Sequence, residues 1–314
     1  MRIVVALGGN ALLKRGEPMT AGTQRANVGR AAASLAELIG AGHQIVVTHG
    51  NGPQVGLLAL QAAAGPEDGA YPLDILGAES EGMIGYLIEQ ELDNCLADET
   101  LIATLLTQIR VDAKDPAFLA PTKPIGPVYE EATARKLAAD RGWQIARDGD
   151  KWRRVVASPA PLEILEIKVI SLLVERGVVV ICGGGGGIPV VARADGSFVG
   201  IEAVIDKDWA SALLVEQLGA DMLLLLTDVD AVYLDFGTPQ ARRIRSAGAA
   251  ALSVDQFAAG SMQPKIEAAI CMATATGKPA AIGRLEDAGA IVLGKAGTTI
   301  ESGDAGISIW SESF

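Results

Sequence analysis

Histidine and cysteine are both scarce in this chain of 314 residues, which has two histidines and three cysteines. The histidines, His43 and His49, leave little material for a histidine-rich metal centre or a histidine-based catalytic triad. The cysteines lie far apart with no C-x-x-C spacing, which argues against a zinc ribbon or a disulfide framework and for a reducing compartment. Positive charge is also in deficit, because 26 basic and 38 acidic residues give a net charge of −12. A basic surface for nucleic acid or for an anionic membrane is therefore not expected.

The chain also lacks a recognisable membrane span or targeting segment. It enters an apolar strand at once, and the uncharged stretch 177–192 is interrupted by five consecutive glycines and a proline. Hydrophobic residues make up 49% of the chain and charged residues 20%, which is ample for a packed core. The sequence predicts a soluble, cytoplasmic protein that binds neither nucleic acid nor a membrane.

Four short apolar runs end in turns rich in glycine or polar residues, at residues 3–7, 45–48, 178–181 and 222–226. Runs without alternation are typical of strands buried on both faces of a parallel sheet. Helical patterns lie between them. Residues 28–39 place apolar side chains on one helical face, and residues 161–176 are predicted to form a helix that begins with proline. This alternation predicts a three-layer α/β/α sandwich with a mainly parallel central sheet.

One segment departs from this alternation of strands and helices. Six of the fourteen prolines fall between residues 116 and 161, together with a charged, amphipathic stretch that continues through Arg154. Such a segment is more typical of an inserted subdomain or lid than of a core strand–helix unit. We expect a small protruding subdomain at about residues 117–160.

The glycine turns are the first candidates for chemistry. In parallel α/β sheets, ligands bind beyond the carboxyl ends of the strands. The turns Gly8-Gly9-Asn10 and Gly50-Asn51-Gly52 both fall there, and glycine lets backbone N–H groups approach an anion closely. The alternative is that these turns only make tight connections between strands and helices.

The common phosphate-binding fingerprints are not found. No G-x-G-x-x-G motif occurs. Gly289 and Gly294-Lys295 have the spacing of a P-loop, but the Ser or Thr that should follow the lysine is replaced by Ala296. Residues 291–293 are predicted to form a strand, so a phosphate loop is not predicted there.

Lysines in unusual surroundings are the second candidates. Lys123 lies between two prolines, Lys207 lies between two aspartates, and Lys265 lies near the start of a predicted helix. Surface lysines need no role, but an acidic protein that handles an anionic substrate must gather its few cations at the site. Phosphoryl transfer requires such cations because its main demands are positioning and charge neutralisation.

A polar turn, Thr227-Asp228, follows the fourth apolar run, and Tyr233 lies a few residues further on. The turn either binds a nucleotide or merely caps the strand, and Tyr233 either stacks near a base or lies in the core. The sequence leaves both alternatives open.

Taken in order, these segments resemble the carbamate kinases, a branch of the amino acid kinase family. The resemblance covers essentially the whole chain, and the ordered set of motifs is far more specific than any single glycine turn. The matching segments are LGGNAL (7–12), THGNGPQVG (48–56), PTKPIGP (121–127), WRRVV (152–156) with SP (158–159), GGGGGIP (183–189), AVIDKD (203–208), LTDV (226–229) and GSM (260–262) with PK (264–265).

The resemblance implies an N-terminal, carbamate-binding lobe at residues 1–203, which includes the subdomain, and a C-terminal, nucleotide-binding lobe at residues 204–314. It implies reversible phosphoryl transfer between ATP and carbamate, formed from ammonia and bicarbonate, to give ADP and carbamoyl phosphate. It also implies that the reaction runs in the ATP-forming direction, in the catabolism of arginine. Mg²⁺ would be held mainly through the nucleotide phosphates rather than by protein side chains, and the family is commonly homodimeric.

The resemblance also implies roles for individual residues. The turns Gly8-Gly9-Asn10 and Gly50-Asn51-Gly52 would hold carbamate and the transferring phosphoryl group. Lys207 and Lys265 would neutralise charge on the phosphoryl oxygens, and Asp208 would hold these lysines in position. Lys123 would reach the phosphates from the subdomain. The nucleotide contacts would be Lys207, Thr227, Asp228, Tyr233, Met262 and Lys265.

Many amino acid kinases have a lysine just before the first glycine turn, where this chain has Ala6-Leu7. Carbamate kinases share that absence and use the subdomain lysine instead, which favours carbamate as the acceptor. The alternatives are a kinase of the same family that acts on an amino acid carboxylate or on UMP, and a catalytically silent, nucleotide-binding regulatory protein of this fold. A dinucleotide oxidoreductase is a more remote alternative.

Overall fold

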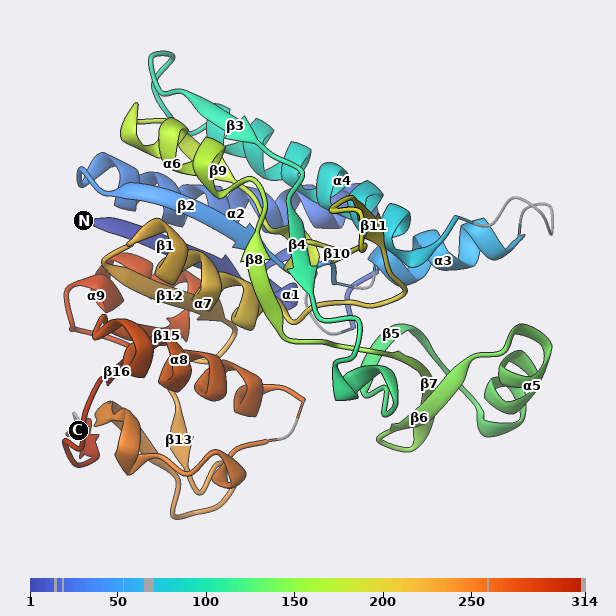
Figure 1. The fold of residues 1–314 in the computed structure, drawn as a ribbon. Coiled ribbons are helices and arrows are strands. Elements are labelled where there is room, and N and C mark those ends of the chain that lie inside the picture. Colours follow the sequence, from blue (N-terminus) through green and yellow to red (C-terminus); the bar gives the residue numbers. More distant parts are fainter. Residues whose placement is uncertain (14–15, 19, 53, 65–70, 259, 312–314) are drawn as a thin grey trace.

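A ten-stranded sheet forms the centre of the protein in this computed structural model, which describes residues 1–13, 16–18, 20–52, 54–64, 71–258 and 260–311 (Figure 1). In spatial order its strands are β13 (Tyr233–Leu234), β14 (Arg242–Gly248), β16 (Thr298–Glu301), β15 (Ala280–Arg284), β12 (Met222–Thr227), β1 (Arg2–Leu7), β2 (Gln44–His49), β9 (Val179–Ile181) and β3 (Ile102–Thr104), with β17 (Ser308–Ile309) beside β14. Neighbouring strands are parallel all the way from β15 through β12, β1, β2 and β9 to β3. The antiparallel pairs are β13–β14, β14–β17 and β15–β16, and they all lie at the opposite end of the sheet. The predicted, mainly parallel sheet is confirmed.

Helices cover both faces of this sheet, because successive side chains of a strand point to opposite sides. In β1, Ile3 and Val5 belong to a core shared with α2 (Ala21–Gly40), α4 (Leu73–Asp93) and α9 (Ala288–Val292). Val4 and Ala6 belong to a second core, shared with α6 (Ile167–Glu175), α7 (Lys207–Leu218) and α8 (Met262–Thr276). This arrangement confirms the three-layer α/β/α sandwich.

The four predicted strands are present as β1, β2, β9 and β12, and the helix predicted at residues 28–39 lies within α2. The helix predicted at residues 161–176 is wrong in its first part. The chain first forms β8 (Pro161–Ile164), which pairs antiparallel with β4 (Gln108–Val111), and α6 begins only at Ile167. Pairing with a distant strand overrides the local helical pattern there.

The strand predicted at residues 291–293 is also wrong. Ile291 and Val292 end the short helix α9, where Ile291 is buried against the sheet. A run of three apolar residues is too short for periodicity to separate a strand from a buried helical turn.

Two smaller sheets accompany the central one. The first contains β11 (Phe198–Gly200), β10 (Ile188–Ala192), β4 and β8. The second contains β5 (Lys123–Tyr129), β7 (Lys151–Val156) and β6 (Gln144–Asp148), and with α5 (Glu131–Arg141) it protrudes from the body of the molecule (Figure 1). The small protruding subdomain predicted from the prolines is therefore present.

The subdomain touches the body through α3 (Gln54–Ala64), which follows β2 and packs on β5. A Cβ atom on Gly56 of α3 would lie 2.0 Å from the Cα of Gly126 in β5, so the two backbones meet where no side chain fits. A short helix, α1 (Gly9–Leu12), follows β1. Among the described residues, no helix is both long and apolar enough to cross a membrane.

Candidate active site

The carboxyl ends of β2, β1 and β12 lie side by side in the middle of the sheet, and the turns that follow them open into one cleft of about 670 Å³. The cleft is lined by residues from the first glycine turn, the second glycine turn, the start of β5, the start of α7, the turn after β12 and the start of α8. Of the predicted site residues, it brings together Gly8, Gly9, Gly50, Asn51, Gly52, Lys123, Lys207, Asp208, Thr227, Asp228, Tyr233, Met262 and Lys265. Asn10 lies in α1, and the placement of its side chain falls outside the described residues.

The two glycine turns form one wall because their backbones approach each other and the sheet. The Gly8 N–H donates to the Leu226 carbonyl at 2.9 Å, and the Gly50 N–H donates to the Leu7 carbonyl at 3.1 Å. A Cβ on Gly9 would contact Gly52, and one on Gly50 would contact the aliphatic part of Lys207 at 3.5 Å. The lysine side chain thus passes directly over the second glycine turn.

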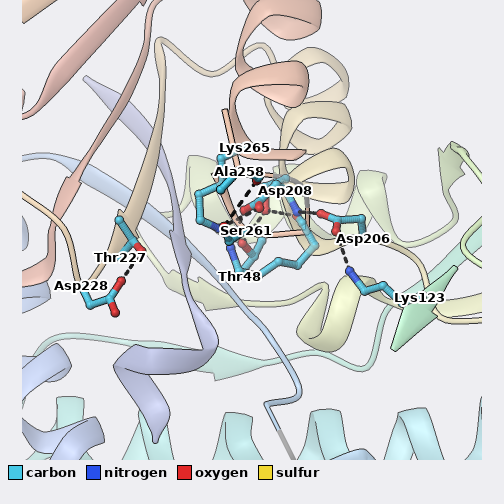
Figure 2. Close-up of polar contacts among 11 residues, drawn as sticks. Thr48, Lys123, Asp206, Asp208, Thr227, Asp228, Ala258, Ser261 and Lys265 are labelled. Carbon is cyan, nitrogen blue, oxygen red and sulfur yellow. Dashed lines mark hydrogen bonds and ion pairs between the residues drawn. The ribbon is translucent and has the colours of Figure 1, made fainter. Parts of the chain in front are cut away.

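Asp208 holds two lysines at the centre of the cleft (Figure 2). Its Oδ1 lies 2.5 Å from the Lys207 Nζ, and its Oδ2 lies 2.9 Å from the Lys265 Nζ. Asp208 is only 3% exposed. Burial alone would raise the pKa of Asp208, but the two ammonium groups overcome this effect and hold the pKa well below its usual value. A single carboxylate therefore positions two cations that come from different helices, α7 and α8.

Asp206 was not singled out as a site residue by the sequence, yet it connects the subdomain to this cluster. Its Oδ2 accepts a hydrogen bond from the Lys123 Nζ at 2.5 Å, and its Oδ1 accepts one from the Asp208 N–H at 2.9 Å (Figure 2). Asp206 caps the N-terminus of α7. The preference for aspartate at helix N-caps would have found the cap, but not the lysine partner from a distant strand.

The other end of the cleft is largely apolar and aromatic. Tyr233 lies at the wall rather than in the core, and its ring meets that of Phe236 edge-on, with 5.8 Å between centroids. The Tyr233 hydroxyl donates to Asp230 at 2.9 Å, and Asp230 also pairs with Arg243 at 3.0 Å. This network fixes the tyrosine ring at the surface of the cleft, an arrangement suited to a flat, apolar group such as a base.

His49 lies directly behind the second glycine turn. It is completely buried, and its Nδ1 donates to the Gly50 carbonyl at 3.0 Å. Burial lowers its pKa to about 4, so the imidazole is neutral near pH 7. Through this hydrogen bond, His49 orients the backbone of the second glycine turn.

We expect the His49 imidazole to remain neutral in the folded protein until the pH approaches 4. Because the unfolded chain binds this proton near the ordinary pKa of 6.5, folding stability should fall as the pH drops from about 6.5 to about 4. Imidazole signals followed by NMR test this directly, since the chain has only two histidines and a His43→Gln variant assigns them. A His49 midpoint near pH 6.5 would contradict the expected shift.

No cluster of three or more histidine, cysteine, aspartate or glutamate side chains arranged to bind a metal ion is present in the part of the chain that the structure describes. Asp206 and Asp208 are both engaged with lysines. These carboxylates fit the organisation of cations better than the ligation of a resident metal.

Comparison with known proteins agrees with this geometry. The model of the amino acid kinase family matches residues 1–284. The carbamate kinase of Haemophilus influenzae is 55% identical over 311 residues, which cover 99% of this chain and all of that protein. The carbamate kinase of Giardia lamblia bound to AMP-PNP has a TM-score of 0.88 and 43% identity, covering 96% of this chain and 98% of that one. A UMP kinase of Bacillus anthracis, at 15% identity and a TM-score of 0.56, shares the fold alone.

The chain therefore belongs to the amino acid kinase family. Within that family its curated relatives at 44–55% identity are carbamate kinases, and they match it over nearly its full length. The resemblance inferred from the motifs is confirmed, and neither a different acceptor class nor a silent homologue is favoured.

Proposed function

We propose that the protein catalyses the reversible transfer of a phosphoryl group between ATP and carbamate, giving ADP and carbamoyl phosphate. The observation that carries this proposal is the Lys207–Asp208–Lys265 cluster, which adjoins the second glycine turn through Lys207 and lines the same cleft as the aromatic side chains. The turns provide backbone donors for a small anion, and the aromatic side chains suit a base. The two lysines supply the positive charge that a transferring phosphoryl group needs.

The reaction needs no general base, because a carbamate oxygen already carries negative charge. This oxygen forms a bond to the γ-phosphorus, the bond from that phosphorus to the β–γ bridging oxygen breaks, and ADP leaves with the electron pair. Lys207 and Lys265 neutralise the charge on the phosphoryl oxygens, and Asp208 keeps both ammonium groups in place during the transfer. The buried, neutral His49 has no proton-transfer role in this mechanism.

Mg²⁺ would enter with the nucleotide and supply further charge neutralisation at its phosphates. Asp206 and Asp208 are already paired with lysines, which supports binding of Mg²⁺ through the nucleotide phosphates rather than by protein side chains. We further propose that residues 1–203 form the acceptor lobe, with the subdomain at about 117–160, and that residues 204–314 form the nucleotide lobe. The glycine turns come from the first part, and Thr227, Tyr233 and Met262 come from the second.

Lys123→Ala should raise the KM for ADP and for carbamoyl phosphate by about 10- to 100-fold, because one charged hydrogen bond to the phosphates is lost. Lys123 is held at the cleft by Asp206, so exchange of this carboxylate for a phosphate requires little movement. Lys151→Ala is the matched control, because Lys151 lies in β7 of the same small sheet and pairs with Glu130 at the start of α5. Equal kinetic constants for the Lys123 variant and the wild type would reject this role.

We also propose a homodimer, formed through an apolar surface on α4 and its neighbours. Exposed apolar side chains at 75, 83 and 86 follow helical spacing, and Gly82 of α4 lies against Leu106. A face of this kind on a soluble protein is typical of an interface. Light scattering should give twice the chain mass, and Tyr86→Asp should shift the protein towards the monomer. We assign to this interface the exposed apolar side chains of Tyr71, Ile75, Met83, Tyr86, Leu106, Phe198 and Val199.

A cytoplasmic location is proposed because the three cysteines, Cys95, Cys182 and Cys271, are all free thiols.

The decisive experiment measures ATP formation from ADP, Mg²⁺ and carbamoyl phosphate by the purified protein. Two comparison reactions are run in parallel: acetyl phosphate replaces carbamoyl phosphate in one, and UMP is offered with ATP in the other. Rapid ATP formation from carbamoyl phosphate alone supports the proposal. Nucleotide binding without turnover on any of these substrates would reject it in favour of a silent homologue, and turnover of UMP would reject it in favour of a different kinase.

A further inference from the structure

A layer of buried polar groups lies behind the second glycine turn and takes no part in the chemistry described above. It is built from the loop Gly183–Gly187, which follows β9, and from the buried side of α4. From Gly184 to Gly187 the loop has no room for side chains. A Cβ on Gly184 would lie 2.4 Å from the His49 ring, and one on Gly185 would lie 2.4 Å from the side-chain amide of Asn51. The loop backbone is thus the surface against which Asn51 rests.

Glu81 of α4 holds this loop in place by hydrogen bonds. It is only 1% exposed, and its Oε1 accepts the N–H of Gly184 at 2.7 Å. Its Oε2 accepts the N–H of Thr107 at 3.2 Å, and the Thr107 hydroxyl oxygen in turn accepts the N–H of Gly183 at 2.9 Å. Two successive N–H groups of the loop are therefore fixed, one by Glu81 directly and one through Thr107.

Asn51 is also held from its other side. Ser80, the neighbour of Glu81 on α4, is fully buried, and its hydroxyl oxygen lies 3.4 Å from the Asn51 amide nitrogen. The same hydroxyl donates to the Gly77 carbonyl at 2.8 Å, which orients its lone pairs towards Asn51. The amide that lines the acceptor end of the cleft is thus held between α4 and the glycine loop.

We propose that Glu81 is a positioning residue for the acceptor site, which acts on Asn51 through the backbone of Gly184 and Gly185. Glu81 does not line the cleft, so it does not touch the substrate. A site of this kind depends on the layer behind the contacting group, since a shift of a fraction of an ångström is enough to lose a hydrogen bond to a small substrate. The inference rests on the proposed function, because it assigns Asn51 to acceptor binding.

The test is Glu81→Gln, which keeps the volume of the side chain but replaces one accepting oxygen by an NH₂ group. That group cannot accept the N–H of either Thr107 or Gly184, so a buried donor loses its partner. Glu79→Gln is the matched control, because it makes the same change at an exposed position of the same helix, two residues away. Burial raises the pKa of Glu81 to about 8, so steady-state rates of ATP formation are measured at pH 9, where the carboxylate is ionised, with ADP and carbamoyl phosphate varied in turn.

We expect Glu81→Gln to raise the KM for carbamoyl phosphate about tenfold or more, with the KM for ADP unchanged within about twofold. Glu79→Gln should match the wild type in both. A purely structural defect would change both KM values together or lower only the amount of active protein, and either result would overturn the inference. So would an unchanged KM for carbamoyl phosphate.

A second variant keeps the test decisive if Glu81→Gln does not fold. Thr107→Val removes the acceptor for the Gly183 N–H at nearly constant side-chain volume. It should likewise raise the KM for carbamoyl phosphate and leave the KM for ADP unchanged. The proposed function and this inference fail in different ways. If the wild-type protein forms no ATP, the proposed function is rejected. If the wild type is active but neither folded variant raises the KM for carbamoyl phosphate more than the KM for ADP, only the role of Glu81 is rejected.

Discussion

Lys207→Ala and Lys265→Ala should each lower the turnover number for ATP formation by about 10²-fold or more, which is the usual effect of removing one preorganised group that stabilises charge in the transition state. The side chains of Lys207 and Lys265 are only 11% and 14% exposed, and both ammonium groups point at one carboxylate, so their positions are set before substrate binds. Water that fills the space of a missing lysine cannot replace a fixed positive charge. Initial rates at saturating ADP and carbamoyl phosphate measure the loss.

Lys295→Ala is a suitable control for these variants. Lys295 follows the P-loop-like glycine spacing but lies exposed beyond α9, remote in sequence from the cleft residues. We expect it to retain normal turnover, because that glycine spacing does not form a phosphate loop here. A near-normal rate for Lys207→Ala or Lys265→Ala would remove that residue from the catalytic assignment, whatever Lys295→Ala does.

Asp208→Asn should lower the free energy of unfolding by about 3–5 kcal/mol, because it leaves two largely buried lysines without their shared, buried counter-ion. The loss should be visible as a lower midpoint in urea unfolding and should accompany a loss of turnover. Asp304→Asn, at an exposed position, should change neither.

The stabilisation by Asp208 also has a defined dependence on pH. Since the pKa of Asp208 is lower in the folded protein than in the unfolded chain, the contribution is complete above the ordinary pKa of 3.8 and is lost as the pH falls below it. The stability difference between Asp208→Asn and the wild type should therefore be constant near neutral pH and shrink in strong acid. A difference that stays the same in strong acid would contradict the ion-pair explanation.

Much of this fold follows from sequence patterns alone. Apolar runs without alternation predict buried parallel strands, and the rule that ligands lie beyond their carboxyl ends brings the turns at Gly8 and Gly50 together. Both rules depend on contacts between residues close in sequence or on the geometry common to all such sheets. For this reason they succeed without knowledge of the particular packing.

The failures have the opposite cause. The strand at residues 161–164 exists because β4 lies beside it, and the role of Asp206 exists because Lys123 arrives from another sheet. Glu81 lies in a segment from which the sequence suggests no function, since its partners, the N–H groups of Gly184 and Thr107, carry no side-chain signature. Contacts of this type are set by tertiary packing, and a linear pattern does not contain them.

The pairing of Lys123 with Asp206 in the cleft has a consequence for the direction of the reaction. On the proposed mechanism, a phosphate oxygen takes the place of the Asp206 carboxylate, so arrival and departure of a substrate are substitutions of one counter-ion of Lys123 by another. Lys123 therefore has an anionic partner both before and after substrate binds, and each substrate competes with Asp206 for it. A site with such an internal competitor avoids trapping ATP or ADP, which is the property that a catalyst needs to operate near equilibrium in both directions.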